Sequence, residues 1–336
     1  LDVFTIMDDG EILSLSIESM TNNIVLGDQT AITGWRQMDE TYVVIGYSNY
    51  EEGNPNAPSA TIYTIKDKKV INTQLIPGIR STTGVIASGD LNGDGYVDLF
   101  IGGRHDPGNY PSNATSRIFL NQDGVFVPDL LNSKLLEDIG MVTDATIADI
   151  TGNGFQDILL SLKWGEIKIL ENRSGRLVDR TEELGLSSHQ GLWNGVAIGD
   201  FNNDGRIDFV ATNIGDNTPY QNVESYPIRL YYDDLDFDGR ADLVEAYYVE
   251  ELDCYAPMRK LHEYSSIRTI LQNVQSHREF AVSCMEDIFG EQISESPFKM
   301  INTTSNMVFM NSGDDFIGQK LPDQSQLTTA HAALVS

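Results

Sequence analysis

A short acidic segment occurs four times in this chain and constrains its fold more than any other feature. Each copy follows the pattern D-x-[DNT]-x-[DN]-G-x-x-D with the same internal spacing. The copies read DLNGDGYVD, DITGNGFQD, DFNNDGRID and DLDFDGRAD, and they begin at Asp90, Asp149, Asp200 and Asp234. An apolar or mixed run precedes each copy, and a β-rich run follows it. Such self-similarity predicts a repeat fold in which each repeat contains a strand, a tight acidic loop and a second strand.

A second element recurs downstream of the acidic segments. Arg117–Asn121, Ile167–Asn172 and Met307–Asn311 each lead into a glycine-containing turn and another short strand, and residues 61–65 are a degenerate copy. Two inner strands joined by an acidic loop, followed by an outer hairpin, make a four-stranded propeller blade. The sequence therefore predicts an all-β fold, with residues 1–336 forming a single β-propeller domain of six or seven four-stranded blades.

The spacing of the acidic segments is irregular. Their starts are separated by 59, 51 and 34 residues, and 34 is short for a full blade, so the assignment around residues 213–235 stays open. Residues 252–290 lose the alternation of a strand and show helical apolar spacing at Ile267, Ile270 and Val274. We expect a helical insertion here between two strands of one blade, with the outer hairpin resuming near Asn306.

The remaining boundaries follow from the same pattern. Residues 1–80 are expected to form blades without calcium loops, residues 84–250 the calcium-loop blades, and residues 306–336 the last hairpin and a closing or truncated strand. Thr329–Val335 resembles the strand that opens a new blade. Either the chain is cut there, as a mature or excised fragment beginning at Leu1 would be, or this strand closes the ring against strands at residues 2–6 and 12–17.

The two cysteines, Cys254 and Cys284, lie thirty residues apart. With so few cysteines no disulfide framework holds the fold together. One bridge between them and two buried thiols are both compatible with the sequence.

The acidic loops predict metal sites. Oxygen-bearing side chains at alternating positions can point at one centre, and the glycine permits the turn that brings the seventh carbonyl inward. Six to eight oxygen ligands suit Ca²⁺, whereas Mg²⁺ demands a stricter octahedron. The alternative is that these residues form ordinary turns. We expect three to four Ca²⁺ ions, held by the side chains at positions 1, 3, 5 and 9 and the carbonyl at position 7: Asp90, Asn92, Asp94, Tyr96 and Asp98; Asp149, Thr151, Asn153, Phe155 and Asp157; Asp200, Asn202, Asp204, Arg206 and Asp208; Asp234, Asp236, Asp238, Arg240 and Asp242.

Charge excludes some partners. The 50 acidic and 22 basic residues give a formal net charge of −28, which repels nucleic acid and anionic membrane surfaces. A hydrophobic content of 40% argues for a packed fold rather than disorder. No run of about twenty apolar residues occurs, so no membrane insertion is expected. A bound cation would neutralise part of the acid.

These loops resemble the FG-GAP/VCBS repeats of integrin α-subunit propellers and of many secreted bacterial proteins, over roughly residues 84–330. Four further stretches resemble a bacterial subgroup akin to cartilage acidic protein (ASPIC/UnbV-type): residues 101–111, 140–145, 226–231 and 286–289. The resemblance implies a calcium-bearing propeller on the cell surface or in the periplasm. It implies no particular reaction.

The sequence favours binding over catalysis. None of the common hydrolase or nucleotide-binding motifs is present. In this kind of blade, a second group of loops gathers on the face opposite the acidic loops, where aromatic, arginine and asparagine residues suit recognition of a protein or glycan. Packing of the two tryptophans between blades is the alternative. The candidate ligand residues are Arg104, His105, Tyr110, Trp164, Trp193, Asn194, Asn213 and Asp216.

The leading functional hypothesis is therefore a calcium-stabilised, extracytoplasmic recognition or adhesion module with an extracellular protein or glycan partner. The alternatives are a lectin-like propeller and a hydrolase acting on an extracellular polymer.

Overall fold

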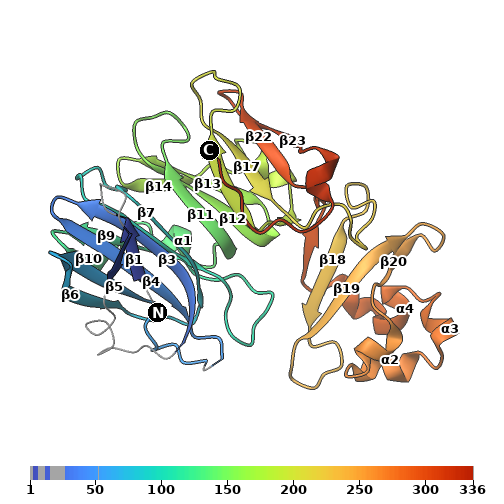
Figure 1. The fold of residues 1–336 in the computed structure, drawn as a ribbon. Helices are drawn as coiled ribbons and strands as arrows, with labels where there is room; N and C mark the ends of the chain where they lie inside the picture. Colours follow the sequence, from blue (N-terminus) through green and yellow to red (C-terminus); the bar gives the residue numbers. More distant parts are fainter. Residues whose placement is uncertain (1–2, 7–11, 16–26, 52, 336) are drawn as a thin grey trace. The chain divides into compact units, whose positions relative to one another are not determined.

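The computed structural model describes residues 3–6, 12–15, 27–51 and 53–335 (Figure 1). The chain divides into two compact units. The first comprises Leu1–Leu160 with Ile169–Arg180, and the second comprises Ser161–Lys168 with Thr181–Ser336.

The first unit contains antiparallel sheets in which four consecutive strands are neighbours in sequence order, which is the arrangement of a propeller blade. A shorter pair, β1 (Val3–Ile6) and β2 (Ile12–Leu15), precedes them. The strands of the first blade are β3 (Asp28–Gln37), β4 (Glu40–Ser48), β5 (Ala60–Lys66) and β6 (Lys69–Ile76). Those of the second are β7 (Thr83–Gly89), β8 (Asp98–Gly103), β9 (Arg117–Gln122) and β10 (Val125–Pro128).

After the short helix α1 (Ser133–Leu136), a third blade comprises β11 (Met141–Ala148), β12 (Asp157–Gly165), β13 (Ile167–Arg173) and β14 (Arg176–Asp179). Its residues 161–168 belong to the second unit.

The burial pattern explains why these segments are strands. In β8 every residue from Asp98 to Gly103 is buried, as expected for a strand covered on both faces. In β3 the residues alternate between exposed and half-buried along much of the strand, which is the period of an edge strand with one solvated face. A core that includes Val44, Ile62 and Phe119 joins the first two blades.

The first blade lacks an acidic loop, as predicted for residues 1–80. Only Met38 and Asp39 separate β3 from β4, and Met38 takes a left-handed backbone conformation with φ of 55°.

The second unit contains a blade that is interrupted by a whole second sheet. β15 (Gly191–Leu192) pairs with the end of β12. The blade itself has the order β16 (Gly195–Gly199), β17 (Asp208–Thr212), β22 (Met307–Asn311) and β23 (Phe316–Lys320). In Figure 1 the red β22 lies beside the yellow β17, about a hundred residues earlier in the chain, and Val210 is directly opposite Val308.

The inserted sheet has the order β20 (Cys254–Pro257), β19 (Asp242–Val249), β18 (Ile228–Asp233) and β21 (Phe298–Ile301). The fourth acidic loop joins β18 to β19. It therefore belongs to the insertion and not to a blade that follows the third loop, which explains the short interval of 34 residues.

The predicted helical insertion is confirmed, although its first residues are a strand. Cys254–Pro257 forms β20 because it pairs with β19, from Val249 to Ala246. The helical part consists of short elements: η4 (Leu261–Tyr264), α2 (Arg268–Asn273), α3 (His277–Phe280), α4 (Met285–Phe289) and η5 (Gly290–Ser294).

The helices pack on the inserted sheet, and a disulfide fastens them to it. Ile270 of α2 and Ile288 of α4 lie in one buried cluster with Val244 of β19. Figure 1 shows the short helices beside β19 and β20. A disulfide joins Cys254 to Cys284. Of the two possibilities that the sequence left open, the bridge is therefore the one in the structure.

The predicted strand at Thr329–Val335 is wrong. This segment is not a strand, and its backbone hydrogen bonds with Asn194 and Asn213 are made to loop residues beside β16. The N–H of Ala330 donates to the Asn213 carbonyl (3.1 Å), and the Asn194 amide donates to the Ala330 carbonyl (3.0 Å).

The all-β, propeller-type fold predicted from the sequence is confirmed by these sheets. The number of blades and the closure into one domain stay predictions.

Candidate metal sites in the acidic loops

Each acidic loop joins two antiparallel neighbouring strands, as predicted. The loops that begin at Asp90, Asp149, Asp200 and Asp234 connect β7 to β8, β11 to β12, β16 to β17 and β18 to β19. In the sheets, the residue before the loop pairs with the ninth residue, as Gly199 does with Asp208. The strands therefore hold the two ends of every loop close together.

The glycine at position 6 takes the turn conformation that the pattern predicts. In the first loop Gly95 has a φ of 85°, in the left-handed region that favours glycine. Its N–H donates to Oδ2 of Asp90 at 2.9 Å. The same hydrogen bond occurs in the second, third and fourth loops, also at 2.9 Å. The first aspartate of each loop thus points inward.

Position 4 also requires a left-handed backbone, which the sequence pattern did not reveal. Gly93, Gly152, Asn203 and Phe237 occupy it, with φ values of 79°, 73°, 59° and 59°. Glycine and asparagine tolerate this conformation, whereas an aromatic residue is strained in it. Phe237 is 77% exposed, so no side-chain packing compensates for that strain.

The ninth aspartate is buried in three of the four loops. Asp98, Asp157 and Asp208 are completely buried, and Asp242 is partly buried. Burial raises the pKa of Asp98 to about 6, against two backbone hydrogen bonds that lower it. Burial, together with the charges of neighbouring aspartates, also raises the pKa of Asp242 to about 6. A nearby cation stabilises the charged form of a buried carboxylate whose pKa is raised.

An asparagine from the second repeated element connects each blade loop to its outer hairpin. The N–H groups of Asn121, Asn172 and Asn311 donate to the ninth aspartate of their own loop at 2.7–2.8 Å. Their side-chain amides donate to the carbonyl of the eighth loop residue, at 3.2, 2.9 and 3.2 Å. Their Oδ1 atoms accept an N–H from a glycine of the hairpin turn. The motif was visible in the sequence, but this role was not predicted.

The first two loops also contact each other. The Gln156 side chain, at position 8 of the second loop, accepts the backbone N–H of Asp90 at 2.7 Å. The amide of Asn172 donates to the Leu91 carbonyl at 2.8 Å. Gln156 thus links the second loop to the first, and Asn172 of β13 links the first loop to the third blade.

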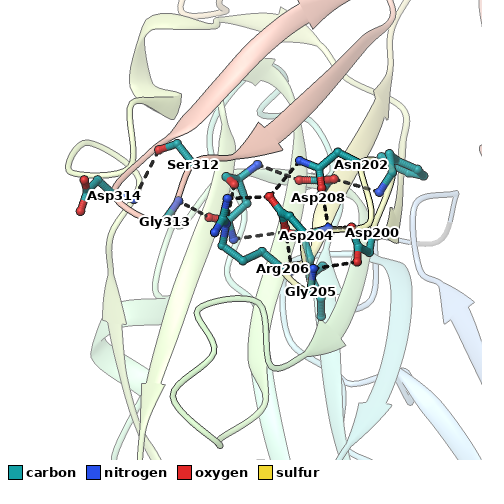
Figure 2. A network of polar contacts seen from close by, with 12 residues as sticks. Asp200, Asn202, Asp204, Gly205, Arg206, Asp208, Ser312, Gly313 and Asp314 are labelled. Carbon is teal, nitrogen blue, oxygen red and sulfur yellow. Dashed lines mark hydrogen bonds and ion pairs between the residues drawn. The ribbon is translucent and has the colours of Figure 1, made fainter.

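In the third loop an arginine approaches the candidate ligands (Figure 2). Arg206 forms an ion pair with Oδ2 of Asp204 at 2.5 Å, and the amide of Asn202 donates to the same oxygen at 2.9 Å. Nε of Arg206 donates to the Asn311 carbonyl at 2.8 Å. A cation at this site has to share Asp204 with a guanidinium group.

The fourth loop has the arrangement best suited to a metal ion. Oxygen atoms of Asp234, Asp236 and Asp242 lie within 4.8 Å of one another, and among the described residues this is the group of acidic side chains that meets a metal-ligand geometry. Oδ1 of Asp236 is buried and accepts no hydrogen bond. Its Oδ2 accepts the N–H of Arg268 at the start of α2 (2.9 Å). The donor set fits a hard cation such as Ca²⁺, because it combines several carboxylates with one unsatisfied oxygen.

The candidate ligand residues of the first unit lie partly at its surface. Tyr110 is 43% exposed, whereas Arg104 and His105 are half-buried. Burial lowers the pKa of Arg104, and burial together with the Arg104 charge lowers the pKa of His105. The ring of His105 packs edge-on against Tyr50, with 4.8 Å between the ring centres.

In the second unit the two tryptophans are core residues. Trp164 is 5% exposed and Trp193 is completely buried, so neither ring offers a binding surface, and their assignment as ligand residues is corrected. Nε1 of Trp193 donates to the His189 carbonyl at 3.2 Å. This burial favours the packing alternative, because a fully enclosed indole contributes its area to the core.

The polar candidate ligand residues of the second unit, Asn213 and Asp216, form hydrogen bonds within the protein. The Asn213 amide donates to the Thr303 carbonyl (2.9 Å). The Asp216 carboxylate accepts hydrogen bonds from Thr304, Ser305 and Lys320.

The FG-GAP-like repeat family matches the chain over residues 90–160 and 149–211, a range that contains the first three loops. Integrin alpha-3 of Mus musculus is 30% identical over 131 residues, which cover 37% of this chain and 12% of the integrin. Integrin alpha-3 of Cricetulus griseus is 29% identical over 131 residues, which also cover 37% of this chain and 12% of the integrin. The chain thus spans a small part of the length of these relatives.

Two solved structures have similar stretches. A beta-fructofuranosidase from Schwanniomyces occidentalis is 14% identical, with a TM-score of 0.37 over 69% of this chain and 46% of that one. The xyloglucan-locus protein GH43B of Bacteroides ovatus is 15% identical, with a TM-score of 0.32 over 70% and 42%. These values support no functional assignment. Among the described residues, no helix is both long and apolar enough to cross a membrane.

Proposed function

We propose that this FG-GAP-repeat, propeller-type protein is a calcium-stabilised recognition module that acts outside the cytoplasm and binds a protein or glycan partner without catalysing a reaction. The fourth loop carries the proposal, since three carboxylates converge there around a buried oxygen of Asp236 that has no hydrogen-bond partner. The repeated hydrogen-bond pattern of all four loops supports it. The finer resemblance to the ASPIC/UnbV-type subgroup stays a prediction.

The location outside the cytoplasm is supported by two observations. The relatives matched in sequence are integrins, and the disulfide between Cys254 and Cys284 is of a kind that persists in oxidising compartments. Calcium at millimolar concentration in such compartments is compatible with loops of modest affinity.

The loops are proposed to differ in affinity. The fourth offers four aspartates and the second only Asp149 and Asp157, so the fourth is expected to bind most tightly and the second most weakly. Arg206 weakens the third because it neutralises Asp204.

Equilibrium dialysis with Ca²⁺ tests this order. Wild-type protein is expected to bind three to four ions. Asp236→Asn is expected to weaken the tightest site by about tenfold or more, since it removes a charged ligand. Asp314→Asn, at an exposed turn outside the loops, is the matched control and should bind as wild type does. Unchanged binding by Asp236→Asn would exclude the fourth loop as the tightest site.

Calcium stabilisation is expected to depend on pH. The raised pKa values of Asp98 and Asp242, each about 6, mean that both groups are largely protonated at pH 5 and ionised at pH 7. Calcium binds only the ionised form, so the rise in melting temperature on adding Ca²⁺ should be larger at pH 7 than at pH 5.

Without calcium, the pH dependence of stability that comes from Asp98 and Asp242 has the opposite direction. Because their pKa values are raised in the folded state, their contribution to stability is present below about pH 4 and is lost as the pH rises through 6. Thermal unfolding at fixed ionic strength, with Ca²⁺ and with EDTA, measures both effects. A calcium-induced shift that is equal at the two pH values would contradict the assignment of these aspartates as ligands.

The hydrolase alternative has less support. Glu245 lines a cavity of about 680 Å³ in the second unit, but its carboxylate is bound by Arg259 (3.1 Å) and by the Tyr220 hydroxyl (2.9 Å). Asp216 lines another cavity, and although burial raises its pKa, Lys320, Ser305 and Thr304 lower it below the usual value. A catalytic general acid needs the opposite shift.

A further inference from the structure

A cavity in the first unit is lined by a half-buried arginine, Arg117, which forms no ion pair with the described residues. The cavity has a volume of about 600 Å³, within the range of small-molecule sites. It lies beside β9 and α1, and Arg117 of β9 lines it.

The hydrogen bonds of Arg117 go to neutral groups. One terminal nitrogen donates to the Pro77 carbonyl and the other to the Ser59 hydroxyl, both at 2.7 Å. The guanidinium carbon lies 5.2 Å from the centre of the Phe119 ring. A guanidinium group has five N–H donors in a planar fork, so donors remain for a ligand. Burial lowers the pKa of Arg117 to about 10, and no acidic neighbour offsets this effect.

The other two cations around the cavity are in ion pairs, whereas the hydrogen bonds of the carboxylate Asp129, like those of Arg117, go to neutral groups. Arg80 pairs with Asp106 (3.4 Å) and Lys134 with Glu137 (2.6 Å). Asp129 accepts hydrogen bonds from the backbone of Leu131 and from the amide of Asn132. Among the described residues that line the cavity, Arg117 is thus the cation left without a counter-charge. Such a group is stabilised by an anion, most effectively by one that matches its planar fork.

The rest of the lining restricts the ligand. Ile79, Ile118 and Pro128 offer an apolar wall, and Thr115 is among the hydroxyl-bearing residues that line the cavity. The net charge of −28 repels polyanions. The ligand should therefore carry a single carboxylate on a compact, otherwise neutral body.

We propose that this cavity binds a small monocarboxylate, such as a hexuronic acid, with Arg117 holding the carboxylate. The site lies outside the acidic loops. It extends the proposed recognition function by naming a ligand class, and it does not require that the loops bind calcium.

Isothermal titration calorimetry with D-galacturonate and with D-galactose tests the proposal. The two sugars share a ring and differ in the carboxylate, so galacturonate should bind measurably and galactose at least tenfold more weakly. Arg117→Gln is expected to lose about tenfold or more in galacturonate affinity, because it removes a charge-assisted pair. Arg176→Gln, which changes an exposed arginine of the same unit outside the cavity, should bind as wild type does.

Arg117→Lys is the control for a folding defect in Arg117→Gln, because lysine keeps the positive charge and the aliphatic part of the side chain. It should still bind at least about threefold more weakly than wild type, because an ammonium group cannot form the bidentate contact. Equal affinity of wild type for the two sugars, or full affinity of either Arg117 variant, would overturn the proposal. Titrations in Ca²⁺ and in EDTA, with the melting temperature recorded, separate this result from a failure of the calcium sites.

Discussion

Asn172→Ala is expected to lower the free energy of unfolding by about 3 kcal/mol or more, an unusually large effect for one polar side chain. Asn172 is completely buried. Its amide donates to the carbonyls of Leu91 and Gln156, and its Oδ1 accepts the N–H of Gly175. Alanine leaves the buried Leu91 carbonyl and the partly buried Gln156 carbonyl and Gly175 N–H without this partner, and an unsatisfied buried group costs about 1–3 kcal/mol. Urea unfolding monitored by circular dichroism measures the change.

Two further variants sharpen this test. Asn121→Ala should cost less, because the Asn121 amide donates to one carbonyl, that of Val97, at a longer 3.2 Å. Asn56→Ala, at an exposed position, should stay within about 0.5 kcal/mol of wild type. If Asn172→Ala proved no more destabilising than Asn56→Ala, the asparagine would not connect the loop to its hairpin as described.

Reduction of the disulfide is expected to destabilise the inserted sheet and its helices by about 3–4 kcal/mol. Cys254 and Cys284 are 30 residues apart, and closing a loop of that length lowers the entropy of the unfolded chain by a corresponding amount. The loop contains α2 and α3, which reach the buried cluster through side chains such as Ile270. Hydrogen exchange with mass spectrometry should therefore show faster exchange in residues 254–294 after reduction.

The Cys254→Ser/Cys284→Ser variant is the control for this experiment. It should exchange like the reduced protein and should not respond to reductant. Unchanged exchange in the variant would mean that the hydrophobic cluster alone holds the helices.

The strands and loops of the blades were predictable because their signals are local. The alternation of the strands and the D-x-x-x-x-G spacing depend on neighbouring residues, and Gly95 takes the left-handed conformation that the pattern required. The inserted sheet was not recognised, because the pairing of Val210 with Val308 across almost a hundred residues leaves no local signal.

The misassigned residues have a similar explanation. Trp193 precedes β16 in a segment that could equally be a surface loop or a packed turn, and its burial depends on contacts such as that with Phe309. Thr329–Val335 has the composition of a strand, but Ala330 is bound to the loop residues Asn194 and Asn213. The left-handed position occupied by Phe237 could not be seen, because the residue type argues against it.

Thermal unfolding in EDTA, in Ca²⁺ and in Mg²⁺, combined with elemental analysis of bound metal, shows whether the acidic loops hold calcium. A metal that binds only the folded chain stabilises it by about 2.7 kcal/mol per site at a hundred times Kd. If the acidic loops bind calcium, the melting temperature rises strongly with Ca²⁺ alone and three to four ions are bound per chain. An unchanged melting temperature with no bound metal would show that the acidic loops are only turns, and would contradict the account.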